Sequence, residues 1–311
     1  MKFKVTFICI ICASFLQLNA QRVTYSTNYD DPGRLRNLNF YFSPLYGEVT
    51  TFERNDGKKI ADNRAQMGWA LGAKLETIPG LLDKRFGVVF RYRRAYNRDS
   101  TEPKQITATN LEIGGSFKLF EKVKEKSYRI RVSSTRTTET SLGGVTMTQL
   151  NRFFVRGGIF SSKSPVNVMS KDTDVRGSGF YGGIKFTRGV CYEADISGYG
   201  YRGKEFRSSL YADLMFAPKV VYSPYTSTKT SGPDWNPTTT TTTTDITQEL
   251  KKINSIPKFG YRLGYLMEYN SGSGVGFNYV MEIGKKPPYH GYYFYIGGGI
   301  SFNFQLAFNK Q

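Results

Sequence analysis

The sequence predicts an all-β fold, an antiparallel transmembrane β-barrel of about twelve strands (range 10–14) after an N-terminal signal peptide. Three observations predict it: apolar and polar residues alternate along most regular segments, the last segment is unusually long and apolar, and the N-terminus is of the export type. A mean hydropathy of −0.41 excludes a bundle of membrane helices. It is compatible with a barrel, whose polar lumen and loops dilute the apolar outer face.

The last regular segment, residues 292–308, reads YYFYIGGGISFNFQLAF. Its apolar side chains recur with a period of two, which is the period of a strand. Its length far exceeds the roughly 5 or 6 residues of a typical globular strand. Such a strand is expected to cross lipid and to close the barrel, because a closed barrel leaves no unpaired backbone edge in the hydrocarbon. The triple glycine 297–299 is expected to allow close packing or a bend in the strand.

Other segments repeat this alternation, with one apolar face and one small, polar or charged face. The segment with a helical period is 247–254, TQELKKIN, which is long enough for two turns. The expected strands cover residues 37–43, 67–76, 86–96, 106–120, 127–138, 150–161, 177–188, 192–202, 206–223, 258–270, 274–285 and 291–308.

The connections between these strands differ in length in the way typical of outer-membrane barrels, which have long outer loops and short inner turns. The connections expected on the outer side are 44–66, 97–105 and 224–257. The connections expected on the inner side are 77–85, 121–126 and 271–273. Residues 162–176 break this pattern, because they would form a long inner turn.

The first twenty residues, MKFKVTFICIICASFLQLNA, have the features of a secretory signal peptide. Two lysines precede an apolar run, and Ala20 offers a cleavage site; a membrane anchor is the alternative, for which the run is short. Residues 21–36 are then expected to be a periplasmic segment, and residues 37–311 the barrel. Cys191 is the one cysteine beyond residue 20, so no internal disulfide is expected.

The formal net charge is +18. Predicted export argues against nucleic acid as a partner and favours acidic lipid head groups or small anionic solutes. The longest loop, about 224–257, contains seven consecutive threonines, Thr238 to Thr244. We expect it to be an extended, disordered extracellular loop, either a tolerated insertion or a glycan-bearing stalk. Asp99-Ser100-Thr101 resembles the short acceptor motif for O-glycosylation in Bacteroidota.

Three stretches carry a family resemblance: LNAQ at 18–21, the alternating strand SLYADLMFAP at 209–218, and the terminal GGGISFNFQLAF. Together they resemble the small outer-membrane β-barrel proteins of Bacteroidota, over nearly the whole mature chain. The resemblance implies an outer-membrane location, a porin-like barrel, and insertion by the barrel assembly machinery, which recognises an aromatic-rich last strand.

Many basic residues fall on the predicted inward faces. They are Lys74, Arg91, Arg93, Lys118, Arg129, Arg131, Arg156, Lys185 and Arg262. The acids among them are Glu76, Glu112, Glu268 and Glu282. A lumen lined this way would attract anions. Alternatively, these side chains pair with the glutamates and with lumen tyrosines and fill a narrow barrel.

Tyrosines cluster near predicted strand ends, where amphipathic rings suit the lipid head-group level; a ligand-stacking platform is the alternative. They are Tyr41, Tyr46, Tyr92, Tyr96, Tyr222, Tyr225, Tyr289, Tyr292 and Tyr293. The single histidine, His290, excludes metal sites built from several histidines. The sequence predicts no cofactor site and no catalytic site.

The expected function is that of a non-enzymatic outer-membrane barrel, either a narrow pore with a basic lumen or a structural barrel that displays loops. The alternative is a component of an envelope secretion, motility or surface-assembly complex, acting through the loops 44–66 and 224–257. A lipid-acting barrel enzyme, with His290 as its base, is a minor alternative. A soluble β-sandwich is the alternative architecture.

Overall fold

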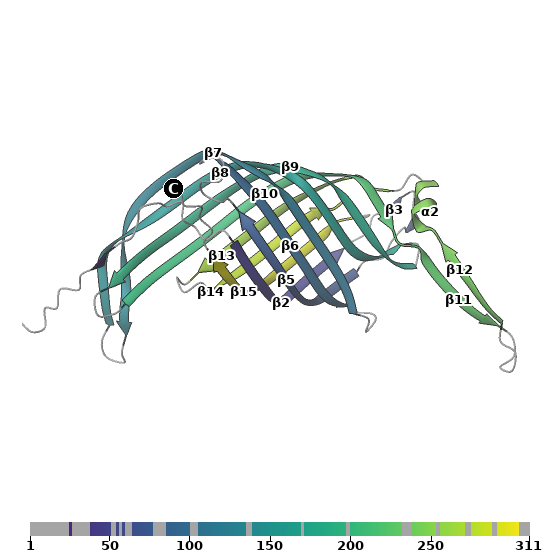
Figure 1. The fold of residues 1–311 in the computed structure, drawn as a ribbon, viewed down its shortest axis with the longest axis horizontal. Helices are drawn as coiled ribbons and strands as arrows, with labels where there is room; N and C mark the ends of the chain where they lie inside the picture. The colour runs from purple at the N-terminus through teal and green to yellow at the C-terminus, as the bar shows by residue number, and fades with distance from the viewer. Residues whose placement is uncertain are drawn as a thin grey trace, which may run out of the picture.

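The computed structural model of the chain is built almost wholly of strands (Figure 1). It describes residues 25–26, 38–50, 54–55, 58–59, 64–76, 85–99, 105–134, 139–168, 171–196, 200–231, 238–252, 256–270, 275–287 and 291–304. Within these residues, ten strands form one barrel: β2 (Leu38–Thr50), β5 (Arg64–Glu76), β6 (Phe86–Asp99), β7 (Gln105–Ser134), β8 (Glu139–Val168), β9 (Lys171–Ile196), β10 (Gly200–Tyr222), β13 (Phe259–Asn270), β14 (Val275–Lys285) and β15 (Tyr293–Phe304).

The barrel is closed and antiparallel. Each strand pairs with the next in chain order, and the last, β15, pairs with the first, β2. Closure leaves no place for the separate sheets of a β-sandwich. The register between β15 and β2 shifts between Gly298 and Ile300, inside the triple glycine where a bend was expected. The elements outside the barrel are β1 (Tyr25–Ser26), which pairs with β9, β3 (Arg54–Asn55), β4 (Lys58–Lys59), β11 (Tyr225–Ser231), β12 (Thr238–Thr244) and α2 (Ile246–Lys252).

The described residues form a barrel of ten strands, fewer than the expected twelve and at the lower limit of the expected range of 10–14. The segments 106–120 and 127–138 are parts of one strand, β7, and 192–202 is divided between β9 and β10. The charged run EKVKEK at 121–126 was interpreted as a turn, but it continues β7, because a strand that leaves the membrane can carry charge on both faces. Likewise 162–176 is no long turn, since most of it belongs to β8 and β9.

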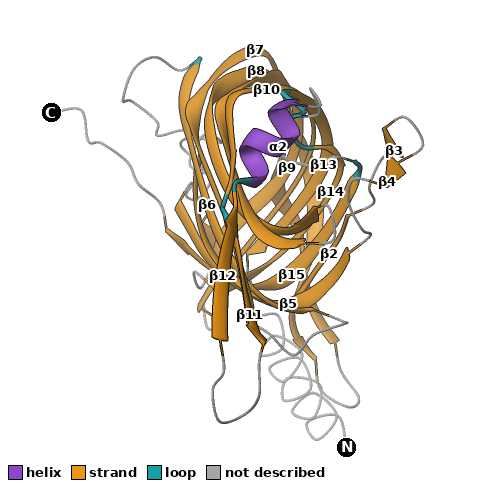
Figure 2. Ribbon diagram, turned by 90° about the vertical axis from the view of Figure 1, so that its right-hand side faces the viewer, coloured by secondary structure: helices purple, strands orange, loops and turns teal. Residues whose placement is uncertain are grey.

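The threonine-rich segment is also more regular than expected. Thr238–Thr244 forms β12, which pairs in antiparallel register with β11, from Tyr225 opposite Thr244 to Ser231 opposite Thr238. Threonine is β-branched and favours extended backbone, so the homopolymer forms a strand once a partner is present. The expected helical segment is present as α2, which follows directly (Figure 2).

The strands alternate in direction, so the barrel has two distinct ends. The end at which β2 begins and β15 ends is called the terminal end; the other, where α2 lies, is the α2 end (Figure 2). The connections expected on one side, 44–66, 97–105 and 224–257, join strands at the α2 end, as the strand directions require. The turns expected at 77–85 and 271–273 join strands at the terminal end.

One wall of the barrel is much longer than the rest (Figure 1). Strands β7 to β10 have 30, 30, 26 and 23 residues, whereas the other six have 11 to 14. The shorter lengths are sufficient for crossing a bilayer, which needs roughly 9–11 residues of a tilted strand. Because β6 begins at Phe86, opposite Phe117, β7 continues past it by residues 118–134. The long wall therefore projects beyond the barrel at the terminal end.

The barrel is apolar outside and polar inside. On β10, Leu214 is 74% exposed while its neighbours Asp213 and Met215 are 3% and 5% exposed. Met67 on β5 and Phe259 on β13 are also exposed on the outer surface. This arrangement is the inverse of a water-soluble domain and is the pattern of a lipid-facing surface. Among the described residues, no helix has the length and apolar character needed to span a membrane.

Candidate functional site

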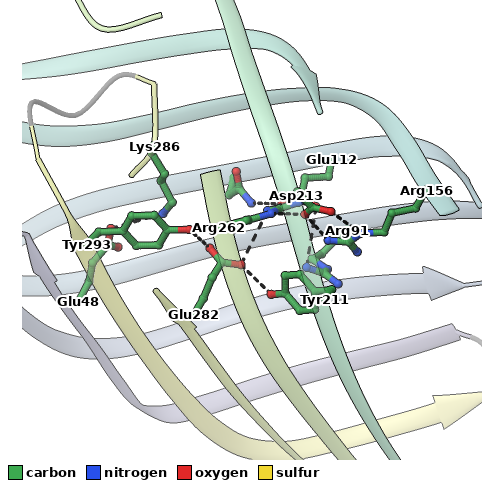
Figure 3. Close-up of polar contacts among 11 residues, drawn as sticks. Glu48, Arg91, Glu112, Arg156, Tyr211, Asp213, Arg262, Glu282, Lys286 and Tyr293 are labelled. Atoms are coloured by element: carbon green, nitrogen blue, oxygen red, sulfur yellow. Dashed lines mark hydrogen bonds and ion pairs between the residues drawn. The ribbon is translucent and has the colours of Figure 1, made fainter. Parts of the chain in front are cut away.

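Arg262, on β13, lies at the centre of an ion network that crosses the lumen (Figure 3). Its two Nη atoms donate to the carboxylate of Glu112 on β7, one of them at 2.9 Å. Strands β8, β9 and β10 separate β7 from β13 in the barrel, so this contact spans the interior. The Nε atom of Arg262 donates to Asp213 on the adjacent β10 at 2.5 Å. All three side chains are at most 1% exposed.

Two more arginines complete this network. Arg156, on β8, donates from Nε to Asp213 Oδ1 at 2.8 Å and from Nη2 to Oδ2. Arg91, on β6, has Nη1 at 3.8 Å from Glu112 Oε2. Buried charges are stable only when paired and hydrogen-bonded, and here each carboxylate has two guanidinium partners. The network thereby joins β6, β7, β8, β10 and β13 through the centre of the barrel.

The ring of Tyr211, on β10, lies among the same three guanidinium groups. Its centroid is 4.4 Å from the Cζ atom of Arg156, and 5.3 Å and 5.7 Å from those of Arg91 and Arg262. These separations are within the range of cation–π attraction. Its hydroxyl donates to Glu282 Oε2 at 2.7 Å, so the ring also links the arginines to β14.

The network continues toward the α2 end. The Tyr293 hydroxyl donates to Glu282 Oε1 at 2.5 Å, and Lys286 Nζ lies 4.1 Å from the centroid of the Tyr293 ring. Lys286 Nζ also donates to Glu48 Oε1 at 3.5 Å, and the Tyr46 hydroxyl donates to Glu48 Oε2 at 2.6 Å. Strands β14, β15 and β2 are thus tied into the same buried system.

A second ionic cluster surrounds Glu268 on β13. Lys74, on β5, donates from Nζ to both of its oxygens at 2.9 Å, although β2, β15 and β14 separate the two strands. Asn39 Nδ2, on β2, donates to Oε1 at 3.0 Å. Arg207 Nε, on β10, lies 2.9 Å from Oε2. The contact between Lys74 and Glu268 is therefore a second one that spans the lumen, whereas Arg207 lies directly opposite Glu268 on the adjacent strand.

Small residues make room for the lumen tyrosines. Tyr211 lies opposite Gly264 on β13, where an added Cβ would come within 2.1 Å of the ring. Tyr41 lies opposite Gly72 on β5 in the same way, with its ring 2.2 Å from such a Cβ. The ring packs over the glycine on the neighbouring strand and occupies the space that a side chain at that position would otherwise fill.

The interior keeps a cavity of about 40 Å³ between the two ionic clusters. Its lining includes Tyr41, Arg91, Glu112, Glu268 and Glu282. A cavity of this size has room for about two or three water molecules. It therefore leaves room for water beside the charged side chains that line it.

An apolar cluster fills the lumen at the α2 end. Ile246 and Leu250 of α2 are completely buried and join a cluster with Tyr222 and Tyr295 from the barrel wall. Thr247 links the helix to β10 by two hydrogen bonds. Its Oγ1 accepts from the backbone N–H of Tyr222 at 2.9 Å and donates to the Tyr222 carbonyl at 3.0 Å. The helix lies across this end of the barrel (Figure 2).

The predicted basic lumen residues divide into two groups. Lys74, Arg91, Arg156 and Arg262 take part in the ionic clusters, and Arg93 packs its guanidinium 3.9 Å from the Tyr295 ring centroid. Of the remaining four, Lys118 and Lys185 share the inward-facing row of Tyr211, because Lys118 is opposite Phe154, Phe154 is opposite Lys185, and Lys185 is opposite Tyr211. Lys185 is buried on β9, Lys118 pairs with Glu121 at 3.1 Å, and Arg129 and Arg131 are exposed on the projecting part of β7.

Arg129 and Arg131 were thus assigned to the lumen wrongly. Bulges in β7 between Lys118 and Phe120, and again between Tyr128 and Ile130, interrupt the alternation, and this stretch lies beyond the paired length of β6. Of the acids, Glu112, Glu268 and Glu282 take part in the clusters. The side chain of Glu76 lies outside the described residues.

Several members of the network were missed. Asp213 stands in the quoted strand SLYADLMFAP, where its alternation with Leu214 could have placed it inward beside Tyr211. Glu48 was missed because β2 continues to Thr50, whereas residues 44–66 were expected to form a loop. Lys286 follows β14 directly and carries no periodic signal.

The tyrosine girdle was wrong in part. Tyr46, Tyr222 and Tyr293 are at most 3% exposed, inside the barrel rather than at a lipid boundary. Tyr92 and Tyr225 are partly exposed, Tyr292 is 53% exposed, and Tyr96 stacks on Trp69 with a centroid separation of 4.1 Å. Tyr289 and His290 lie outside the described residues, as do residues 1–20 and the acceptor-like Ser100 and Thr101.

No family model matches the chain, and no curated protein matches it. Among solved structures, it is similar to a high-pH structure of Pseudomonas putida OprB, at 10% identity and a TM-score of 0.20, over 86% of this chain and 94% of that one. It is also similar to a bacterial polysaccharide outer membrane secretin, at 10% identity and a TM-score of 0.20, over 87% of this chain and 100% of that one. Likeness at this level assigns the chain to no family.

Proposed function

We propose that the protein is a non-enzymatic β-barrel of the bacterial outer membrane, a structural barrel with a filled lumen that acts through the elements displayed at its two ends. The observation that carries this proposal is the ion network centred on Arg262, which contacts Glu112 across the lumen and Asp213 on the adjacent strand. An open channel needs a continuous water-filled passage lined by polar groups. Here the charged side chains instead form ion pairs with one another within the lumen.

The membrane location is supported by the outer surface. Large apolar side chains are exposed on all ten barrel strands, as with Phe42 on β2, Ile159 on β8 and Ile283 on β14. Transferring so much apolar surface from water into lipid is strongly favourable, at roughly 25 cal/mol per Å². The signal-type N-terminus, the terminal strand and the family resemblance support an outer membrane of Bacteroidota type, with insertion by the barrel assembly machinery.

The narrow anion pore is the less favoured form of this proposal. The basic residues that would line it, such as Arg156 and Lys74, each bind a carboxylate at hydrogen-bond distance. Two separate obstructions, the ionic clusters and the apolar cluster under α2, would have to open before a solute could pass. In the ionic clusters, side chains from strands far apart in the barrel touch one another across the lumen.

Two elements that extend beyond the barrel favour a role in binding other proteins over a role limited to spanning the membrane. The hairpin β11–β12 stands at the α2 end, and the long wall β7–β10 projects from the terminal end (Figure 1). A barrel that only needed to span lipid would gain nothing from strands of 30 residues. We therefore favour a structural component of an envelope assembly, with contact surfaces on both sides of the membrane.

The test is the conductance of the refolded, detergent-purified protein in a planar bilayer. We expect no discrete steps from wild-type protein shown to be folded by its heat-modifiable migration on a denaturing gel. The triple variant R156A/R262A/L250A should produce steps, because it loosens both obstructions, the central ion network and the apolar cluster under α2. The matched control, R129A/R131A, removes two exposed arginines and should remain silent. Large, anion-selective steps from the wild type would refute the filled lumen and restore the pore.

A further inference from the structure

The outer face of the long wall changes sharply from apolar to basic. Phe120 on β7, Phe153 on β8, Phe186 on β9 and Leu210 on β10 are register partners and form one row across four strands. Phe186 and Leu210 are exposed, whereas Thr187 is buried, so this row faces outward. We call it the boundary row. It is the last mainly aromatic row on this wall before the projection at the terminal end.

The next outward row is polar and basic. It consists of the register partners Lys122, Asn151, Arg188 and Ser208. Lys124 and Lys126 follow on β7 at the alternate positions that share this face, and Lys204 occupies it on β10. All five cations are exposed. We call Lys122, Lys124, Lys126, Arg188 and Lys204 the basic band.

The carboxylates of this region point the other way. Glu121 lies opposite Arg152 and accepts a hydrogen bond from its Nε at 2.5 Å on the inner face. Glu125, four residues further along β7, lies on the same face as Glu121 and therefore on the face opposite Lys122, Lys124 and Lys126. Among the described side chains of these rows, none that faces outward is acidic. All charged side chains on this outward face are therefore basic, although Gln149, Val190 and Phe206 lie among them, and the face borders an apolar belt.

We propose that the basic band binds the phosphate groups of anionic lipid head groups in the membrane leaflet at the terminal end. This inference rests on the proposed membrane location, because the boundary row marks where the hydrocarbon ends. Alternate residues on a strand are about 6.7 Å apart, so Lys122 to Lys126 spans roughly 13 Å along β7. With a strand tilt of about 35–45° this becomes about 10 Å of depth.

That depth exceeds the polar layer of one leaflet by a few ångströms. The head-group region adds roughly 5–7 Å on each side of the hydrocarbon. Lys122 and Arg188 would lie at phosphate level, and the long side chains of Lys124 and Lys126 can reach back toward it. A negatively charged leaflet attracts such residues, each contributing about a fivefold gain in affinity at the surface.

The experiment measures lipid binding to the mature protein in detergent micelles by native mass spectrometry. Phosphatidylglycerol, which is anionic, is titrated against phosphatidylcholine, which has no net charge. Wild type should prefer phosphatidylglycerol, and the variant K122Q/K124Q/K126Q/R188Q should lose at least about tenfold of that preference. The matched control R176Q/K219Q/K251Q/K258Q removes four exposed cations away from the basic band and should retain the preference.

Several outcomes would overturn the inference. They are an unchanged preference in the quadruple variant, an equal loss in the control, or equal competition by soluble glycerol phosphate, which would indicate a phosphate site rather than a membrane contact. Binding of soluble polyglutamate that depends on the band, without any lipid preference, would assign this face to an acidic protein partner. Flotation with vesicles reports membrane insertion independently of lipid preference, so it tests the membrane barrel separately from the basic band. A wild-type protein that never inserts refutes the membrane barrel itself, whereas one that inserts without lipid preference refutes the basic band alone.

Discussion

Replacing Arg262 by alanine should destabilise the barrel more than any other single substitution of a charged residue in the described lumen. Its guanidinium makes three hydrogen bonds to two buried carboxylates, and its side chain is 1% exposed. Removing one partner of a buried ion pair typically costs about 3–5 kcal/mol. Glu112 retains Arg91 and Asp213 retains Arg156, so the cost should lie toward the lower end of this range. About 3 kcal/mol is more than a hundredfold in the unfolding equilibrium.

The assay is urea unfolding of the protein in lipid vesicles, followed by tryptophan fluorescence. The chain has two tryptophans, and a Trp235→Phe background leaves Trp69, which stacks on Tyr96 on the outer surface, as the reporter. The matched control is Arg129→Ala, an exposed arginine whose loss should change the free energy of unfolding by less than about 0.5 kcal/mol. A double-mutant cycle with Glu112→Ala isolates the cross-lumen pair.

An unfolding free energy for R262A within about 1 kcal/mol of the control would refute this reasoning. It would mean that the lumen is wet enough for water to replace the guanidinium. A coupling energy near zero between Arg262 and Glu112 would contradict the cross-lumen contact itself.

Three further predictions concern packing and insertion. Leu250→Ala should lower the stability of the docked helix by about 2–5 kcal/mol and therefore speed cleavage of α2 in limited proteolysis. Replacing the exposed Lys251 by alanine should not change the cleavage rate. Equal cleavage rates for the two variants would argue against the apolar cluster. Gly264→Ala should push the Tyr211 ring away from Glu282 and lower the unfolding free energy by about 1–3 kcal/mol. Gly182→Ala, whose added Cβ would have nothing within 4 Å, should leave the unfolding free energy unchanged. A larger loss for Gly182→Ala than for Gly264→Ala would exclude the packing of the ring over the glycine. Leu214→Lys should weaken vesicle insertion by about 2–4 kcal/mol, against no change for Thr240→Lys on the hairpin, and normal insertion would place Leu214 outside the lipid.

Much of the candidate site could be predicted from alternation alone. Arg262, Arg156 and Lys74 were expected to face inward, because each shares a face with small or polar residues on a strand whose other face is apolar. Asp213 obeys the same rule and was missed. Lys286 follows no rule of this kind, since it lies just past a strand end. The position of Arg129 could not be predicted, because bulges shift the phase of a strand without an obvious sequence signal.

The sequence by itself determined the fold class, the closing strand, the short helix and the positive interior, because a period of two is a local property of the backbone. Tertiary structure alone decided the number of strands. The charged run 121–126 could equally form a turn between two strands or continue one strand outside the lipid, and its composition does not distinguish these possibilities. Tertiary structure also decided which inward charges pair with one another. Glu112 and Arg262 are 150 residues apart in the chain, and only closure of the barrel brings them together.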